Sequence, residues 1–171
     1  MDKPDTYIVG YMINNLKINS MISELTEQNL ITPQNNTHVT LLYLGKNNIF
    51  QPDDKFYNCV KSIKQIDVAE MKICFIGRNL VLELLMTEEQ NKSVRECINE
   101  YEKSPPVPFL HVTLGKIKDR NRSRINKYLL SKYPNGIYIN KCMTTDMDII
   151  HIDHRAEKYT PTKRINWSNL K

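Results

Sequence analysis

The chain has 171 residues, of which 40% are apolar and 25% charged, a composition typical of a globular protein that can bury a core. This balance excludes an intrinsically disordered or collagen-like chain. Its 24 basic and 19 acidic residues give a net charge of +5, which favours a phosphate-bearing ligand without establishing one.

The cysteines and the apolar runs indicate the compartment. None of the four cysteines forms a CxxC pair with another, so we expect free thiols in a reducing environment. No stretch approaches the roughly 20 apolar residues that a membrane span needs, and the first residues lack the apolar run of a signal peptide. We therefore expect a cytoplasmic protein without membrane association.

Hydrophobic periodicity predicts strands and helices in the first half of the chain. Residues 6–13 are rich in aromatic and β-branched types, as strands are, and residues 18–29 have apolar side chains at helical spacing. A turn cluster at 32–36 precedes a predicted strand at 37–45. Residues 52–65 open with proline and two acids, which favours a helix.

The second half is predicted to repeat this alternation. Its expected elements are a hairpin at 69–77 and 80–86, helices at 88–102 and 119–133, and extended segments at 109–117, 136–140, 146–153 and near 164–167. We expect one α+β domain over residues 1–171, made of two intertwined antiparallel lobes that pack face to face with helices outside.

The tetrapeptide HVTL occurs twice, beginning at His38 and at His111. Side chains two residues apart on a strand share a face. His38 therefore lies beside Thr40 and His111 beside Thr113, while the valine and leucine of each copy take the other face. If the two strands face each other across a cleft, that cleft holds two imidazoles and two hydroxyls.

This set of side chains suits phosphoryl transfer without a metal. Histidine titrates near neutral pH, so one imidazole can accept a proton while the other donates one. Threonine hydroxyls can donate hydrogen bonds to the phosphate oxygens, where charge resides in the transition state. A single HxT sequence is more often structural, but two of the four histidines lie in identical tetrapeptides, so we predict a functional pair.

The two motifs resemble those of the 2H phosphoesterase superfamily, which is named for two HxT/S motifs. "HVTLLYLG" is similar to the first family motif and "PFLHVTLGKI" to the second, and the likeness covers nearly the whole chain. It implies a bilobal, pseudo-symmetric α+β fold with two antiparallel sheets facing across a central cleft. It also implies catalytic His38 and His111, phosphate-binding Thr40 and Thr113, and no cofactor. Which histidine is the base and which the acid stays open.

The resemblance also implies a phosphodiesterase that acts on a small nucleotide. We favour hydrolysis of cyclic di- or oligonucleotide second messengers such as cGAMP, in viral immune evasion in the host cytosol. The reasons are a compact chain and a composition compatible with an AT-rich viral genome. The alternatives are a 2′,5′-oligoadenylate phosphodiesterase, an enzyme for RNA ends or 2′,3′-cyclic phosphates, and a non-catalytic nucleotide sponge. No obligatory protein partner is expected.

Other residues are candidates for substrate binding. Tyr11 lies on the opening strand and is expected either to stack on a nucleobase or to pack in a core. Lys116 follows the second motif, where it would reach a phosphate or lie in solvent, and Gly115 marks a bulge or a close ligand approach. Alternation places Tyr43 opposite His38, so we expect it in the core.

Two clusters are expected to be structural. Arg120, Arg122 and Arg124 crowd the start of a predicted helix and are read as a solvated face. His151 and His154 resemble a metal motif only loosely, because a zinc site needs further ligands. We therefore predict no metal site.

Overall fold

The computed structural model describes residues 5–46, 53–56, 70–101, 109–118, 121–134, 137–138, 147–153 and 156–164. Within these ranges nine strands form one antiparallel sheet in the order β7-β4-β5-β6-β3-β1-β8-β9, with β2 beside β6. The strands are β1 (Thr6–Met12), β2 (Ile31–Pro33), β3 (His38–Gly45), β4 (Glu70–Ile76), β5 (Asn79–Leu84), β6 (His111–Ile117), β7 (Ile137–Tyr138), β8 (Met147–Asp153) and β9 (Lys158–Arg164). The described helices are α1 (Leu16–Glu27), α3 (Glu88–Tyr101) and α4 (Arg122–Lys132).

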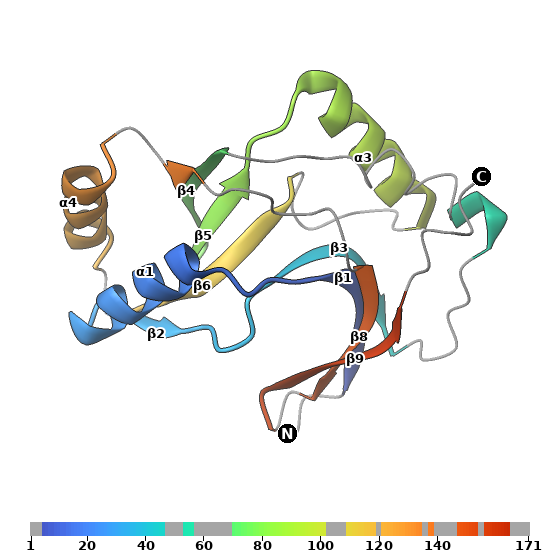
Figure 1. Ribbon diagram of the computed structural model, residues 1–171, viewed down its shortest axis with the longest axis horizontal. Helices are drawn as coiled ribbons and strands as arrows, with labels where there is room; N and C mark the ends of the chain where they lie inside the picture. Colours follow the sequence, from blue (N-terminus) through green and yellow to red (C-terminus); the bar gives the residue numbers. More distant parts are fainter. Residues whose placement is uncertain are drawn as a thin grey trace.

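The sheet consists of two halves that meet at the HVTL strands. β3 pairs with β6 in antiparallel fashion through Val39 and Val112. From this contact β1, β8 and β9 continue one half, and β5, β4 and β7 continue the other. The two half-sheets run in different directions (Figure 1). The expected α+β class with antiparallel strands is confirmed, and the two expected sheets are joined edge to edge by this one pair.

Each HVTL strand has a β-bulge at the same position. The pairing of β3 with β1 skips Leu41, and the pairing of β6 with β5 skips Leu114. Both are the last residue of the tetrapeptide. A bulge adds one unpaired residue to a strand, so the side chains beyond it change faces.

This change of face makes the prediction for Tyr43 wrong. Leu41 and Leu42 are both buried, whereas Tyr43 is 53% exposed. In β6, the bulge at Leu114 likewise places Lys116 on the face opposite Val112, whereas simple alternation would put both on the same face. Of the two alternatives for Gly115, a bulge or a close ligand approach, the structure shows a bulge at the preceding residue, Leu114.

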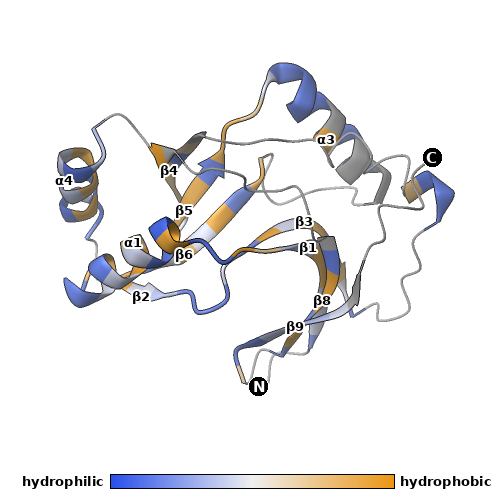
Figure 2. Cartoon of the chain, viewed as in Figure 1, coloured by the Kyte–Doolittle hydropathy of each residue, from blue (hydrophilic) through white to orange (hydrophobic). Residues whose placement is uncertain are grey.

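The core lies on the face of the sheet that carries Val39 and Val112, both fully buried. Helix α1 packs alongside β2 and β6 (Figure 1). Figure 2 shows the alternation of hydrophilic and hydrophobic residues along β6 that separates the two faces. The helical side chains in this core are Ile18, Met21, Ile22, Leu25, Val94, Ile125 and Leu129. The helices therefore cover the face opposite the HxT side chains, as expected.

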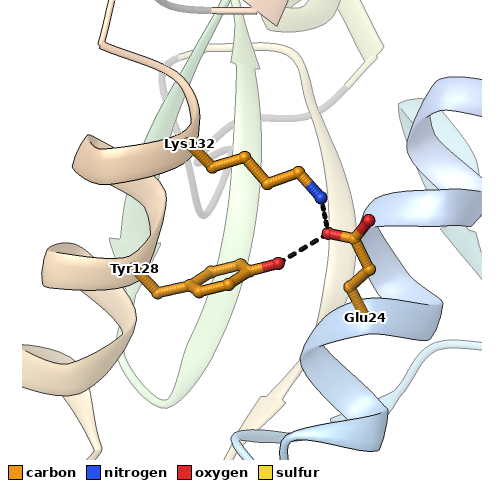
Figure 3. Close-up of polar contacts among 3 residues, drawn as sticks. All are labelled: Glu24, Tyr128 and Lys132. Carbon is orange, nitrogen blue, oxygen red and sulfur yellow. Dashed lines mark hydrogen bonds and ion pairs between the residues drawn. The ribbon is translucent and has the colours of Figure 1, made fainter.

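Local sequence explains how α1 begins and how it meets α4. The Asn15 side chain accepts hydrogen bonds from the backbone N–H groups of Lys17 and Ile18 at 2.9 and 3.2 Å, which caps the helix. The helix therefore begins at Leu16, two residues earlier than the predicted start at residue 18. At its other end the Glu24 carboxylate accepts a hydrogen bond from the Tyr128 hydroxyl at 2.6 Å and pairs with Lys132 (Figure 3).

Some predicted elements differ from the observed ones. Thr32 and Pro33, the first two residues of the turn cluster predicted at 32–36, belong to β2, because their backbone pairs with β6. The last extended segment was predicted near 164–167, so it overlaps β9 (Lys158–Arg164) only at the end of that strand. Most of the helix predicted at 52–65 lies outside the described residues.

Of the cysteines, Cys74 is a free thiol. Among the described helices, none combines the length and apolar character needed to cross a membrane.

The close approach of β1 and β3 predicts a strong effect for Gly10→Ala. A Cβ at Gly10 would lie 2.3 Å from the backbone oxygen of Val39, which cannot move without disturbing the strand pairing. We expect a loss of about 3 kcal/mol or more in the free energy of unfolding, measured in urea.

Gly77→Ala is the matched control. Gly77 has open space around its Cβ position and a φ of +58°, so only backbone strain of about 1–2 kcal/mol is expected. A Gly10→Ala protein as stable as the Gly77→Ala protein would contradict the close packing of β1 on β3.

Candidate active site

The pairing of Val39 with Val112 brings the two HxT motifs together. Opposite residues of an antiparallel pair share a face, and these two valines point into the core. The neighbouring histidines and threonines therefore point to the other face, where all four are half-buried. Extending the register places His38 across from Thr113 and Thr40 across from His111. The structure thus brings all four predicted residues to one site.

Both imidazoles are held in the same way by the backbone. Nδ1 of His38 lies 2.8 Å from the carbonyl oxygen of Asn36, and Nδ1 of His111 lies 3.4 Å from that of Phe109. Each carbonyl belongs to the residue two positions earlier. Because a carbonyl can only accept, Nδ1 carries the proton and donates it. This fixes the neutral tautomer and leaves Nε2 as the nitrogen that can exchange a proton.

Burial controls the protonation of the two histidines. Desolvation lowers the pKa of His38 and of His111 below the ordinary value of 6.5. A positive charge on His111 lowers the pKa of His38 further, so the two rings are close enough to influence each other. In the free protein both rings are thus neutral at pH 7. A bound phosphodiester anion would raise the pKa of both rings by favouring their charged forms.

A cavity of about 580 Å³ adjoins the His38 end of the site. Its walls come from β2 and the loop between β2 and β3, from β5 and β6, and from the hairpin of β8 and β9. The lining residues are Thr32, Pro33, Gln34, Asn35, Asn36, Asn79, Thr113, Gly115, Lys116, Ile152, Asp153, Glu157 and Tyr159. Thr113 connects the cavity to the HxT site, and Lys116 is one of its lining residues.

Three residues beside His38 were not predicted as site residues. The ring of Tyr159 lies against the His38 ring, with centroids 4.8 Å apart. Gln34 Nε2 lies 3.3 Å from both the Tyr159 hydroxyl and the Asn36 carbonyl oxygen. The sequence signal for Gln34 and Asn36 was only that of a turn. Tyr159 belongs to no motif, and only the strand pairing of β8 with β9 places it here.

Of the two positions expected for Tyr11, the structure shows the core and not the cleft, so its assignment as a substrate-binding residue is wrong. It is 3% exposed and belongs to the main core. The physical reason is its register: Tyr11 pairs with Val39, so its side chain shares the core face of the sheet. Burial raises the pKa of its hydroxyl well above the ordinary value.

The other candidate clusters have structural contacts. His151 stacks on Tyr7 with centroids 5.0 Å apart, and its Nε2 lies 3.2 Å from a carboxylate oxygen of Asp5. Arg122 lies over the Phe75 ring and donates to the Gly77 carbonyl. His154 and Arg120 lie outside the described residues. In the part of the chain that is described, no group of three or more histidine, cysteine or acidic side chains is placed to hold a metal.

The fold and the paired motifs define an α+β protein in which two half-sheets are joined by the adjacent HxT strands β3 and β6. Neither a protein-family model nor a curated protein sequence matches the chain. Among solved structures, the MHV ns2 PDE domain aligns with 88% of this chain and 100% of its own length, at 14% identity and a TM-score of 0.52. E. coli LigT in its apo form aligns with 95% of this chain and 97% of its own, at 11% identity and a TM-score of 0.49. The chain thus shares the fold of the MHV ns2 PDE domain, and the fold that the motifs implied is confirmed.

The environment of the histidines predicts their titration. In an NMR titration, the ring resonances of His38 and His111 are expected to shift with midpoints below pH 6.5, because burial penalises the imidazolium. In the His111→Asn protein the His38 midpoint should rise, since a neighbouring positive charge is removed. Midpoints at or above pH 6.5 for both rings, or no effect of His111→Asn on His38, would contradict this electrostatic picture.

Proposed function

We propose that the protein is a metal-independent phosphodiesterase that hydrolyses cyclic di- or oligonucleotide second messengers such as cGAMP. The observation that carries the proposal is the pair of HxT motifs on one face, set across from each other by the Val39–Val112 contact. The shared fold with a protein named as a PDE domain supports the reaction class.

The reaction follows from the arrangement of the four side chains. The substrate phosphate lies over the Val39–Val112 pair, and the hydroxyls of Thr40 and Thr113 donate hydrogen bonds to its non-bridging oxygens. One neutral imidazole takes a proton through Nε2 from water or a ribose hydroxyl as that oxygen attacks phosphorus. The other imidazole, protonated, gives its proton to the leaving oxygen as the old P–O bond breaks. Solvent exchange then restores both rings.

The preference for a small nucleotide rests on the site and its surroundings. A cavity of about 580 Å³ has the size of a small-molecule site. An RNA substrate would call for a longer basic track with stacking residues, and Arg122 of the basic helix is already engaged with Phe75 and Gly77. Degradation of such messengers would serve a virus in the host cytosol. The frequent use of residues that have AT-rich codons is compatible with a viral genome.

Removing the acid–base pair is expected to abolish turnover. His38→Ala and His111→Ala should each lower kcat by about 10²–10⁴-fold, and Thr113→Ala by about 10²–10³-fold, while substrate binding changes little for the histidine variants. EDTA should leave the rate unchanged. Thr160→Ala, on an exposed position of β9, is the control and should keep full activity. Full activity in either histidine variant, or strict dependence on metal, would rule out this mechanism.

A substrate panel separates the proposed messenger from the alternatives. The purified protein is incubated in EDTA with 2′,3′-cGAMP, 3′,3′-cGAMP, cyclic triadenylate, 2′,5′-oligoadenylate and an RNA that ends in a 2′,3′-cyclic phosphate. We expect chromatography to show cleavage of one or more cyclic messengers. Cleavage of only the linear or RNA substrates would move the protein to the oligoadenylate or RNA-processing class. Binding without cleavage of any substrate would favour the nucleotide sponge.

A further inference from the structure

We infer that the cavity beside His38 is a purine-nucleobase subsite, and that Tyr159 and Gln34 couple its occupation to the position of His38. The inference rests on the proposed function in taking the substrate to be a nucleotide. It adds the base class, the residues that read the base, and a physical link between recognition and catalysis.

The chemistry of the cavity wall fits the edge of a nucleobase. Four of its lining residues carry amides, Gln34, Asn35, Asn36 and Asn79. The amide groups of Gln34 and Asn36 donate within the protein, so toward a base these two side chains offer their oxygens as acceptors. An amide both donates and accepts hydrogen bonds, and asparagine and glutamine are the side chains that pair with two adjacent polar atoms of adenine. Thr113 stands at the junction of the cavity with the HxT site, so a nucleotide with its phosphate at the threonines can extend its base into the cavity.

Tyr159 supplies a stacking surface in the same cavity. Its ring is half-buried and packs against a small apolar cluster of Ile8, Ile150 and Ile152, with Met12 at its edge. This support holds the ring in place, and a fixed aromatic ring is a platform on which bases stack. A purine covers more of such a ring than a pyrimidine does, because it has two fused rings, and this favours the purine class.

The same residues hold His38. The Tyr159 ring contacts the His38 ring directly. Gln34 Nε2 lies within 3.3 Å of both the Tyr159 hydroxyl and the Asn36 carbonyl oxygen, and that carbonyl oxygen accepts the hydrogen bond of His38 Nδ1 at 2.8 Å. The Asn36 side chain in turn donates to the Glu157 carbonyl at 2.8 Å, which ties the loop to the β8–β9 hairpin. A base stacked on Tyr159 therefore acts on the residues that orient His38.

Binding measurements with a matched pair of probes test the subsite. Adenosine 5′-monophosphate and ribose 5-phosphate share the phosphoribosyl group and differ in the base, and uridine 5′-monophosphate tests the base class. By titration calorimetry the wild-type protein should bind the adenosine nucleotide about 10-fold or more tighter than ribose 5-phosphate, with the uridine nucleotide between them. Equal affinity for the adenosine nucleotide and ribose 5-phosphate would overturn the inference.

Variants locate the effect in the cavity. Tyr159→Ala should erase the advantage of the adenosine nucleotide and leave ribose 5-phosphate binding unchanged, and Gln34→Ala should reduce that advantage. Gln28→Ala, an exposed amide at the end of α1, is the matched control and should behave as wild type. If the Tyr159→Ala protein unfolds in urea at a lower midpoint, Tyr159→Leu, which keeps a large apolar side chain without the aromatic ring, replaces it and should also erase the advantage. Tyr159→Phe should keep the affinity for the base because the ring remains. Loss of affinity for both probes alike in the pocket variants would contradict a base-specific role.

The link to His38 has its own readout. The ring resonance of His38 should move when the adenosine nucleotide binds the wild-type protein, beyond the shift that ribose 5-phosphate causes. In Gln34→Ala and Tyr159→Phe this extra shift should be lost, and kcat should fall more than KM rises. An unchanged extra shift in both variants would refute the coupling. Because binding needs no turnover, a base-selective protein that cleaves nothing would refute the phosphodiesterase and leave the subsite intact.

Discussion

The contact between Val39 and Val112 determines the geometry on which the rest of the site depends. It is the only described residue pair that joins the two half-sheets along β3 and β6. Both valines are fully buried, so the apolar core fixes which face of each strand points inward. Because the two residues hold the same place in HVTL, antiparallel pairing relates the two tetrapeptides by a local two-fold axis. The histidine of one motif then faces the threonine of the other, which is the arrangement that the proposed phosphodiester cleavage requires.

The repetition extends beyond the four letters into the backbone. Each motif ends in a bulge at its leucine. A glycine also permits a close strand approach near each motif, on the neighbouring strand β1 for the first motif and on β6 itself for the second. Gly10 lies against Val39, and Gly115 lies against Thr32, with the nearest backbone oxygen 2.3 Å from the would-be Cβ in both cases. The bulges interrupt the alternation after the threonine, so two consecutive residues of each strand are buried, and only the next residue, Tyr43 or Lys116, lies on the other face. The chain thus repeats a strand with a built-in change of face.

The sequence was informative where the signal was local. The strands that carry His38 and His111 followed from composition and alternation, and the identical tetrapeptides pointed to the site. Simple alternation failed for Tyr43 because a bulge depends on the partner strand, which no local pattern reveals. Alternation alone could not decide whether Tyr11 lies in the core or in the cleft. Its pairing with Val39 places it in the core. Tyr159 was missed because it reaches His38 only through the pairing of β8 and β9, more than a hundred residues away in sequence.

The two motifs are alike, but the residues around them differ, so the His38 end and the His111 end of the site have different surroundings. His38 has the Tyr159 ring beside it and a short hydrogen bond to Asn36, while His111 has Phe109 edge-on and a longer bond to its carbonyl. Five residues beyond each histidine, the bulge turns Tyr43 outward on one strand and Lys116 on the other. A phosphodiester has two different sides, the attacking oxygen and the leaving oxygen. A symmetric pair of HxT motifs alone would accept it in either direction, so under the proposed function the unequal surroundings are what give the substrate one orientation.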